Sequence, residues 1–114
     1  MADKPLVWMA GEIKTPPFSR EARIETGVLL RRLQRGEKLG MPGYRAMPAV
    51  GRRCGELRVP DENTNWRIML RVDSDAIVIL EVFTKKTRTT PAKVIGTCKR
   101  RLRSYEQAVR EGGE

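Results

Sequence analysis

Apolar and polar residues alternate along residues 65–72, and a second apolar run covers residues 76–83. Both runs are rich in β-branched and aromatic residues, which favour strands. Three turn-forming residues, 73–75, separate them. This pattern predicts a β-hairpin with a three-residue loop.

A three-residue loop would pair Val72 with Ala76 and place Arg67 opposite Glu81, because side chains alternate between the faces of a strand. One face of this hairpin is then wholly apolar and is expected to face the core: Trp66, Ile68, Leu70, Val72, Val78, Leu80 and Val82. The other face carries the arginines together with Ile77, Ile79 and Phe83. Apolar side chains on a basic face predict that a partner covers part of it.

Residues 56–59 form a further short strand, joined to Trp66 through the turn-rich residues 60–65. Turning Leu57 and Val59 toward the core places Arg58 beside Arg67. The open face of the sheet then carries a row of cations, with two more just beyond its end: Arg58, Arg67, Arg71 and Lys85, then Lys86 and Arg88.

Two helices are predicted from their start signals and apolar stripes. Ser19 is a candidate N-cap for a helix from Arg20 to Arg35 that stops at Gly36, and its apolar stripe is Ala22, Thr26, Leu29, Leu30 and Leu33. Thr90 and Pro91 predict the start of a second helix, whose stripe is Ile95, Cys98, Leu102, Tyr105 and Val109.

The remaining elements are a first strand over residues 6–9 and a long loop over residues 36–55, rich in glycine and proline. Loops of this length in a small domain are often functional. This one carries four candidate contact residues: Tyr44, Arg45, Arg52 and Arg53.

The chain has 114 residues, which predicts one domain spanning residues 1–114. Its net charge of +9 predicts a polyanionic partner, nucleic acid or an acidic protein, although a merely solvated basic surface is the plain alternative. The apolar run at residues 6–10 is too short for a signal peptide or a membrane span, so a cytoplasmic location without a membrane partner is expected. With two isolated cysteines and no histidine, neither a metal site nor a cofactor is expected.

Three motifs taken in order resemble the RelE/ParE toxin superfamily, and most of all its phage-derived, HigB-like branch: Glu56-Leu57-Arg58, Trp66-Arg67-Ile68, and residues 79–87 followed by Thr90-Pro91. The resemblance implies an α+β fold, a small curved antiparallel sheet with helices packed on one face. It also implies a small basic toxin of a type II toxin–antitoxin pair, whose partner is a cognate antitoxin, expected to be a helix-turn-helix protein. RelE and HigB types cut messenger RNA on the ribosome, whereas ParE types inhibit DNA gyrase.

Transferred onto matching motifs, the resemblance gives Arg58, Arg67, Lys85 and Lys86 as site residues. Arginine is suited to the scissile phosphate, because guanidinium groups bind phosphate bidentately. We therefore expect Arg67 on that phosphate, Arg58 and Arg88 supporting it, and Lys85 or Lys86 exchanging protons with a pKa lowered by nearby cations. Further RNA contacts are expected from Arg71, Arg45, Arg52, Arg53 and, by stacking on a base, Tyr44.

The sequence is also compatible with two other functions. One is a ParE-like toxin that inhibits gyrase without catalysis, and the other is a noncatalytic nucleic-acid-binding phage protein. For Arg67 itself, the structural alternative is an ion pair with Glu81 across the hairpin. For Lys85 and Lys86, the alternative is a charged strand end that discourages edge pairing.

Overall fold

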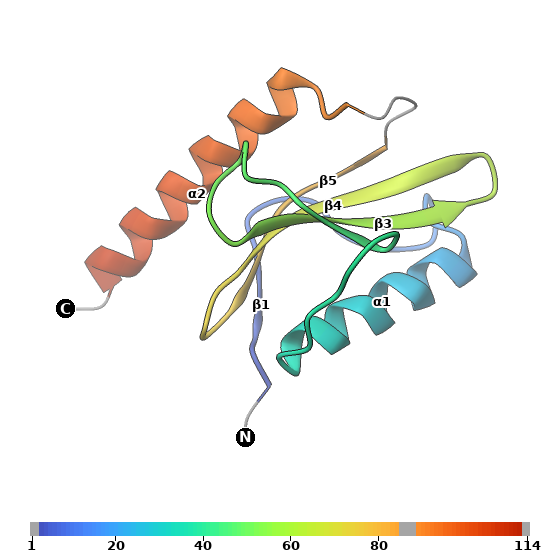
Figure 1. Ribbon diagram of the computed structural model, residues 1–114, viewed down its shortest axis with the longest axis horizontal. Coiled ribbons are helices and arrows are strands. Elements are labelled where there is room, and N and C mark those ends of the chain that lie inside the picture. Colours follow the sequence, from blue (N-terminus) through green and yellow to red (C-terminus); the bar gives the residue numbers. More distant parts are fainter. Residues whose placement is uncertain (1–2, 85–88, 113–114) are drawn as a thin grey trace.

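The computed structural model describes residues 3–84 and 89–112, which form a five-stranded sheet and two helices (Figure 1). The elements in chain order are β1 (Leu6–Trp8), α1 (Arg20–Gln34), β2 (Tyr44–Ala46), β3 (Cys54–Asp61), β4 (Thr64–Val72), β5 (Ile77–Thr84) and α2 (Ala92–Gly112). The strand order is β1-β5-β4-β3-β2. All neighbours are antiparallel except β1, which runs parallel to β5. The predicted α+β class with a mainly antiparallel sheet is confirmed.

Helix α1 forms as its sequence predicts. The Ser19 hydroxyl accepts a hydrogen bond from the backbone N–H of Ala22 and so caps the first turn. The helix ends at Gln34, and Gly36 follows with a φ of +88°, a conformation that glycine adopts without strain. Its buried residues are the five of the predicted stripe, Ala22, Thr26, Leu29, Leu30 and Leu33.

The β4–β5 hairpin has a different register from the predicted one. Val72 pairs with Ile77 rather than with Ala76, and the loop is closed by a 2.9 Å hydrogen bond from Asp73 N–H to the Ala76 carbonyl. The shift by one residue turns Ile77 and Ile79 toward α1, where they are buried, instead of onto the arginine face. The prediction that these two isoleucines need a covering partner is therefore wrong.

A β-bulge in the same hairpin moves Arg67 as well. Leu70 pairs with Ile79 but Met69 pairs with Glu81, so that Leu80 is an extra residue on β5. Beyond this bulge Arg67 lies opposite Phe83, not opposite Glu81. The predicted Arg67–Glu81 pair is wrong, and Glu81 instead forms an ion pair with Arg101 of α2 at 3.2 Å.

The two helices cover opposite faces of the sheet, which corrects the expectation of helices on one face (Figure 1). Helix α1 packs on a core cluster that includes Leu57, Ile68 and Leu70, whereas α2 packs through Cys98 and Leu102 on the other cluster: Met47, Val50, Cys54, Met69, Ala76, Val78 and Leu80. Sheets with both faces buried carry continuous apolar runs, as β5 does over Ile77–Leu80. The end of α2 leaves the body, because Val109 is 53% exposed although it belongs to the predicted stripe.

The β3–β4 hairpin has the predicted register, with Leu57 opposite Ile68 and Arg58 opposite Arg67. Within the predicted loop over residues 36–55, a short strand that the sequence did not predict, β2, pairs with β3. Helix α2 begins at Ala92, one residue later than a Thr90 cap predicts. Among the described residues, no helix is both long enough and apolar enough to cross a membrane.

Candidate nucleic-acid interface

Three arginines lie side by side on the face of the sheet opposite α1. Arg58 and Arg67 are directly paired across β3 and β4, and Arg45 of β2 is paired with Glu56 of β3. Glu56 and Arg58 are two positions apart on one strand and therefore share this face. Side chains at paired positions have Cβ atoms about 5 Å apart. The strands thus bring Arg45, Arg58 and Arg67 together around one carboxylate; we call these four residues the arginine cluster.

Glu56 is the buried centre of the arginine cluster. It is fully buried, and its carboxylate oxygen Oε1 lies 3.7 Å from Nε of Arg67. Its other oxygen accepts a 3.1 Å hydrogen bond from the hydroxyl of Thr90, which lies just before α2. Glu56 therefore connects β3, β4 and the start of α2. The sequence did not predict this role. The available signal was that Glu56 lies two residues from Arg58 on one strand, so that both side chains share a face.

Arg67 is held in an unusual electrostatic environment. The residue is only 6% exposed, and burial, followed by the neighbouring charge of Arg58, lowers its pKa, while Glu56 acts in the opposite direction. An arginine stays protonated under these conditions. Its Nε forms no hydrogen bond within the described part of the chain. Nε is itself buried beside Glu56, so a phosphate would bind the part of the Arg67 side chain that lines a hollow at the sheet edge, where it would supply an acceptor and a compensating charge.

An open hollow of about 560 Å³ lies beside the arginine cluster, within the size range of ligand sites. Arg58, Asn65 and Arg67 line it on the sheet side, and Pro42, Gly43 and residues of α1 line the rest. β2 no longer covers β3 beyond Arg58, whose N–H donates to the Gly43 carbonyl. The hollow thus opens at a free edge of the sheet.

The other predicted catalytic residues, Lys85, Lys86 and Arg88, lie outside the described residues. The chain on either side of them is well placed. Thr84 pairs with Trp66, the neighbour of Arg67, and Thr90 is bonded to Glu56. Thr84 and Thr90 are therefore both held close to Arg67.

Tyr44 lies away from the arginine cluster. It is paired with Leu57, so its side chain is on the α1 face, and it packs against the α1-side core. Gly55 leaves room for the ring, because a Cβ at that position would overlap it. Burial raises the pKa of the Tyr44 hydroxyl. Tyr44, expected from the sequence to stack on a base, thus lies on the opposite face of the sheet from the arginine cluster.

Arg71, Arg52 and Arg53 also lie apart from the arginine cluster, at the α2 end of the sheet. Arg71 forms ion pairs with Asp73 at 2.8 Å and with Glu106 of α2 at 3.4 Å, and its guanidinium lies 5.8 Å from the centre of the Tyr105 ring. It lines a second hollow together with Arg52 and Arg53. The predicted row of cations is thus divided in two.

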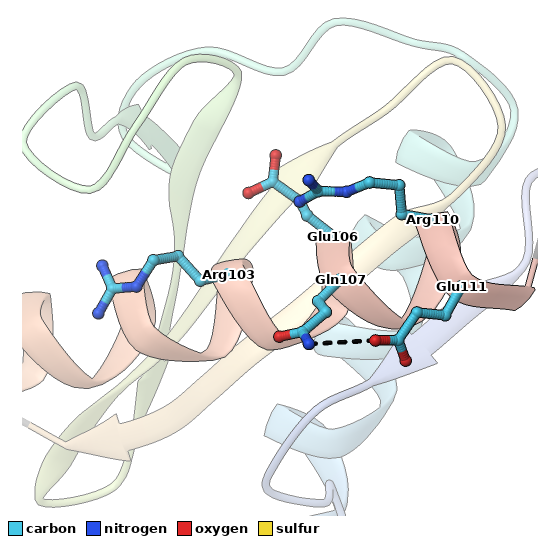
Figure 2. A pocket seen from close by; sticks show the side chains of 5 residues that line it. All are labelled: Arg103, Glu106, Gln107, Arg110 and Glu111. Carbon is cyan, nitrogen blue, oxygen red and sulfur yellow. Dashed lines mark hydrogen bonds between the residues drawn. The ribbon is translucent and has the colours of Figure 1, made fainter.

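A further hollow on α2 gathers no such chemistry. Figure 2 shows its lining residues, Arg103, Glu106, Gln107, Arg110 and Glu111, all of which come from this one helix. Gln107 donates a 3.1 Å hydrogen bond to Glu111, and acids and bases are mixed along the surface. This is the pattern of a solvated helix face.

The described residues hold no cluster of three acidic, cysteine or histidine side chains that would bind a metal ion. Both cysteines are buried, and burial raises the pKa of Cys54 to about 11 and that of Cys98 to about 12. Neutral thiols of this kind are poor nucleophiles and poor metal ligands. The chemistry on the sheet is therefore that of arginine and one buried carboxylate.

A family model described as "Phage derived protein Gp49-like (DUF891)" matches residues 16–103. The chain belongs to this family. The match to the Gp49-like family runs from the segment before α1 to the middle of α2, and it includes the arginine cluster and the lining of the hollow at Arg71 except Glu106. A search among curated proteins finds no significant match.

Proposed function

We propose that this Gp49-like protein is the toxin of a type II toxin–antitoxin pair and that it cuts messenger RNA on the ribosome. The observation that carries the proposal is the arginine cluster, in which a buried carboxylate holds Arg67 beside Arg58. Such preorganised cations stabilise charge that develops in a transition state without further rearrangement. The resemblance of the motifs to RelE and HigB toxins supports the same function.

The proposed reaction is attack of a ribose 2′-oxygen on the adjacent phosphorus. The O2′–P bond forms, the P–O5′ bond breaks, and the products are a 2′,3′-cyclic phosphate and a 5′-hydroxyl. Arg67 binds the two non-bridging oxygens of this phosphate, and Arg58 and Arg45 bind the same or the neighbouring phosphate. The ribosome contributes by holding the messenger in the in-line geometry.

Two proton transfers are needed: one from the 2′-hydroxyl to a base, and one from an acid to O5′. Glu56 is fully buried and is not accessible to a ribose, so it serves as a positioning residue for Arg67. Lys85 and Lys86 remain our candidates for the proton transfers, with Arg88 in support, because the chain on both sides of them is anchored next to Arg67. Cations that crowd a lysine lower its pKa toward neutrality.

The proposed partners are the ribosome with its messenger and a cognate antitoxin. An acidic antitoxin segment would complement a chain with a net charge of +9. Covering the arginine cluster with carboxylates would keep the toxin inactive.

The test is induced expression in bacteria, with growth and transcript ends followed together. Wild type should arrest growth and produce new 5′ ends within translated messengers, mapped by primer extension. Arg67→Ala should slow cleavage about 10²- to 10³-fold, as loss of one preorganised donor does. Arg23→Ala, on the exposed surface of α1, is the matched control and should cut like wild type.

Because Arg67 is buried, circular dichroism and thermal unfolding must show that the Arg67→Ala protein is folded. Arg58→Ala, at a half-buried position, gives a second and milder variant. Growth arrest with intact messengers and damaged DNA would replace the proposal by gyrase inhibition. Harmless expression would replace it by noncatalytic nucleic-acid binding.

A further inference from the structure

A second basic hollow lies on the same face of the sheet, at its other end. Its volume is about 410 Å³, and it is formed between the loop before β3 and helix α2. The loop contributes Arg52 and Arg53, and α2 contributes Lys99 and Arg103; Arg71 of β4 lies between them. Three separate parts of the chain therefore place their cations around one space.

Cations dominate this second basic hollow. Its five cations face two carboxylates, Glu106 in the lining and the adjacent Asp73. Both carboxylates are already paired with Arg71, and Asp73 also with Arg53 at 3.2 Å. Arg52, Lys99 and Arg103 are exposed. The hollow is suited to an anion that carries several charges.

The backbone at Arg53 gives an independent reason to assign a function to this hollow. Arg53 has a φ of +61°, and among the described residues it is the one non-glycine residue with a positive φ. Glycine and asparagine are the usual residues there, because the Cβ atom of other residues crowds the following carbonyl oxygen. The conformation is held by a 3.0 Å hydrogen bond from Val72 N–H to the Arg53 carbonyl. Arg53 brings its cation to this hollow despite that backbone cost, which supports a function for its side chain.

The lining of the hollow also indicates which form of nucleic acid it fits. Single-stranded RNA is bound through bases that stack on aromatic side chains, and the described lining contains none. Guanidinium and ammonium groups bind phosphate, and the backbone of a base-paired helix offers phosphates while its bases face inward. Arg71 is four residues from Arg67 on β4, about 13 Å along the strand. The hollow is thus separate from the arginine cluster.

We infer, on the basis of the proposed RNA target, that the second basic hollow binds the phosphodiester backbone of a base-paired RNA segment and docks the protein on it, while the arginine cluster acts on the substrate strand.

The test measures binding without cleavage. A fluorescent 2′-O-methyl RNA duplex lacks the reactive hydroxyl, and its affinity for the purified full-length protein is followed by anisotropy over a range of salt concentrations. Arg53→Asn removes the cation but suits the positive φ, so the fold is kept. We expect about tenfold weaker duplex binding and a slope of log K against log salt that is shallower by about 0.9, one phosphate contact. Arg53→Lys should recover most of the affinity.

Arg23→Ala is the control and should bind the duplex like wild type, whereas Arg67→Ala should lose less affinity for the duplex than Arg53→Asn. A 2′-O-methyl single strand of the same length should bind more weakly than the duplex and should lose less affinity in Arg53→Asn. Unchanged duplex binding in Arg53→Asn, or an equal loss in Arg67→Ala, would overturn the inference. Absence of messenger cleavage in cells would overturn the proposed function but leave these binding results unaffected.

Discussion

Asp61, at the end of β3, joins three parts of the fold through one carboxylate. One oxygen accepts 2.9 Å hydrogen bonds from the backbone N–H of Ser19, at the start of α1, and from the indole of Trp66. The other accepts a 2.8 Å hydrogen bond from Glu62 N–H. The indole stacks on Phe18 with ring centres 4.0 Å apart. A single side chain thus fixes the position of α1 against the β3–β4 hairpin.

These hydrogen bonds, first those from Ser19 and then that from Trp66, hold the pKa of Asp61 well below its ordinary value. The ionised form therefore stabilises the folded state. This contribution is complete above the unfolded pKa of about 4 and is lost as the pH falls further. Asp61→Asn should lower the melting temperature at pH 7, and the difference from wild type should shrink between pH 4 and pH 2.

Thermal unfolding followed by circular dichroism from pH 7 to pH 2 checks this prediction. Asp75→Asn, at an exposed position in the β4–β5 loop, is the control and should melt like wild type. A difference that stays constant down to pH 2 would show that ionisation of Asp61 does not stabilise the fold.

At the same scale, period-two alternation was enough to predict that Arg58 lies beside Arg67. Alternation alone did not predict the ion pairs of Glu56 and Arg71. Alternation places Glu56 on the face of Arg58, but a carboxylate is rarely fully buried, so its role as the ion-pair partner of Arg67 was not predicted. The surroundings of Arg71 come from α2, more than thirty residues along the chain, and such contacts are decided by tertiary packing.

Among the elements, α2 is attached to the sheet by a short apolar contact. Of its stripe, Cys98 and Leu102 are buried, Ile95 and Tyr105 are partly buried, and Val109 is exposed. The first half of the helix therefore provides the packing. The second half carries Arg103 and Arg110 together with Glu106 and Glu111, so these four residues add no net charge.

Leu102→Ala should destabilise the protein by about 2 to 5 kcal/mol, since it leaves a cavity beneath α2. Val109→Ala, the matched control in the exposed half, should change stability by less than about 0.5 kcal/mol. Urea unfolding measures both. Alkylation of Cys98, located by mass spectrometry, should be slow in wild type and faster in Leu102→Ala, because the thiol is covered only while α2 is docked. Equal losses in the two variants would contradict this account of α2.

The elements also differ in how far the sequence predicted them. Helix α1 was predicted almost to the residue, because its cap, stripe and terminal glycine are all local signals. The register of β5 was not predicted correctly. Ile77–Leu80 are four consecutive apolar residues, so either alternate pair of side chains could face α1. The bulge at Leu80 and the placement of α2 opposite α1 follow from packing both faces, which no single strand reveals.

On the scale of the whole molecule, the sheet carries two separate basic sites, the arginine cluster with its hollow and the second basic hollow. Sites about 13 Å apart that share no partner should act independently. The arginine cluster and the second basic hollow are therefore expected to contribute separately to ribosome binding.

Arg58→Ala and Arg53→Asn should each weaken binding to purified ribosomes, and the double variant should show the product of the two factors to within about twofold. Filter binding at several salt concentrations measures this, with Arg23→Ala as the control. The contrary outcome is a double variant that binds ribosomes with the same affinity as whichever single variant binds less tightly. That result would mean that both arginines bind the same phosphate.

The parallel pairing of β1 with β5 has a consequence for synthesis of the chain. Residues 6–8 are made first, but their partners, residues 77–79, come about seventy residues later. A nascent chain therefore cannot close its sheet until β5 has left the exit tunnel, and contacts of such long sequence separation form slowly. The N-terminal strand therefore stays unpaired, and the sheet incomplete, until residues 77–79 have been synthesised and released from the ribosome.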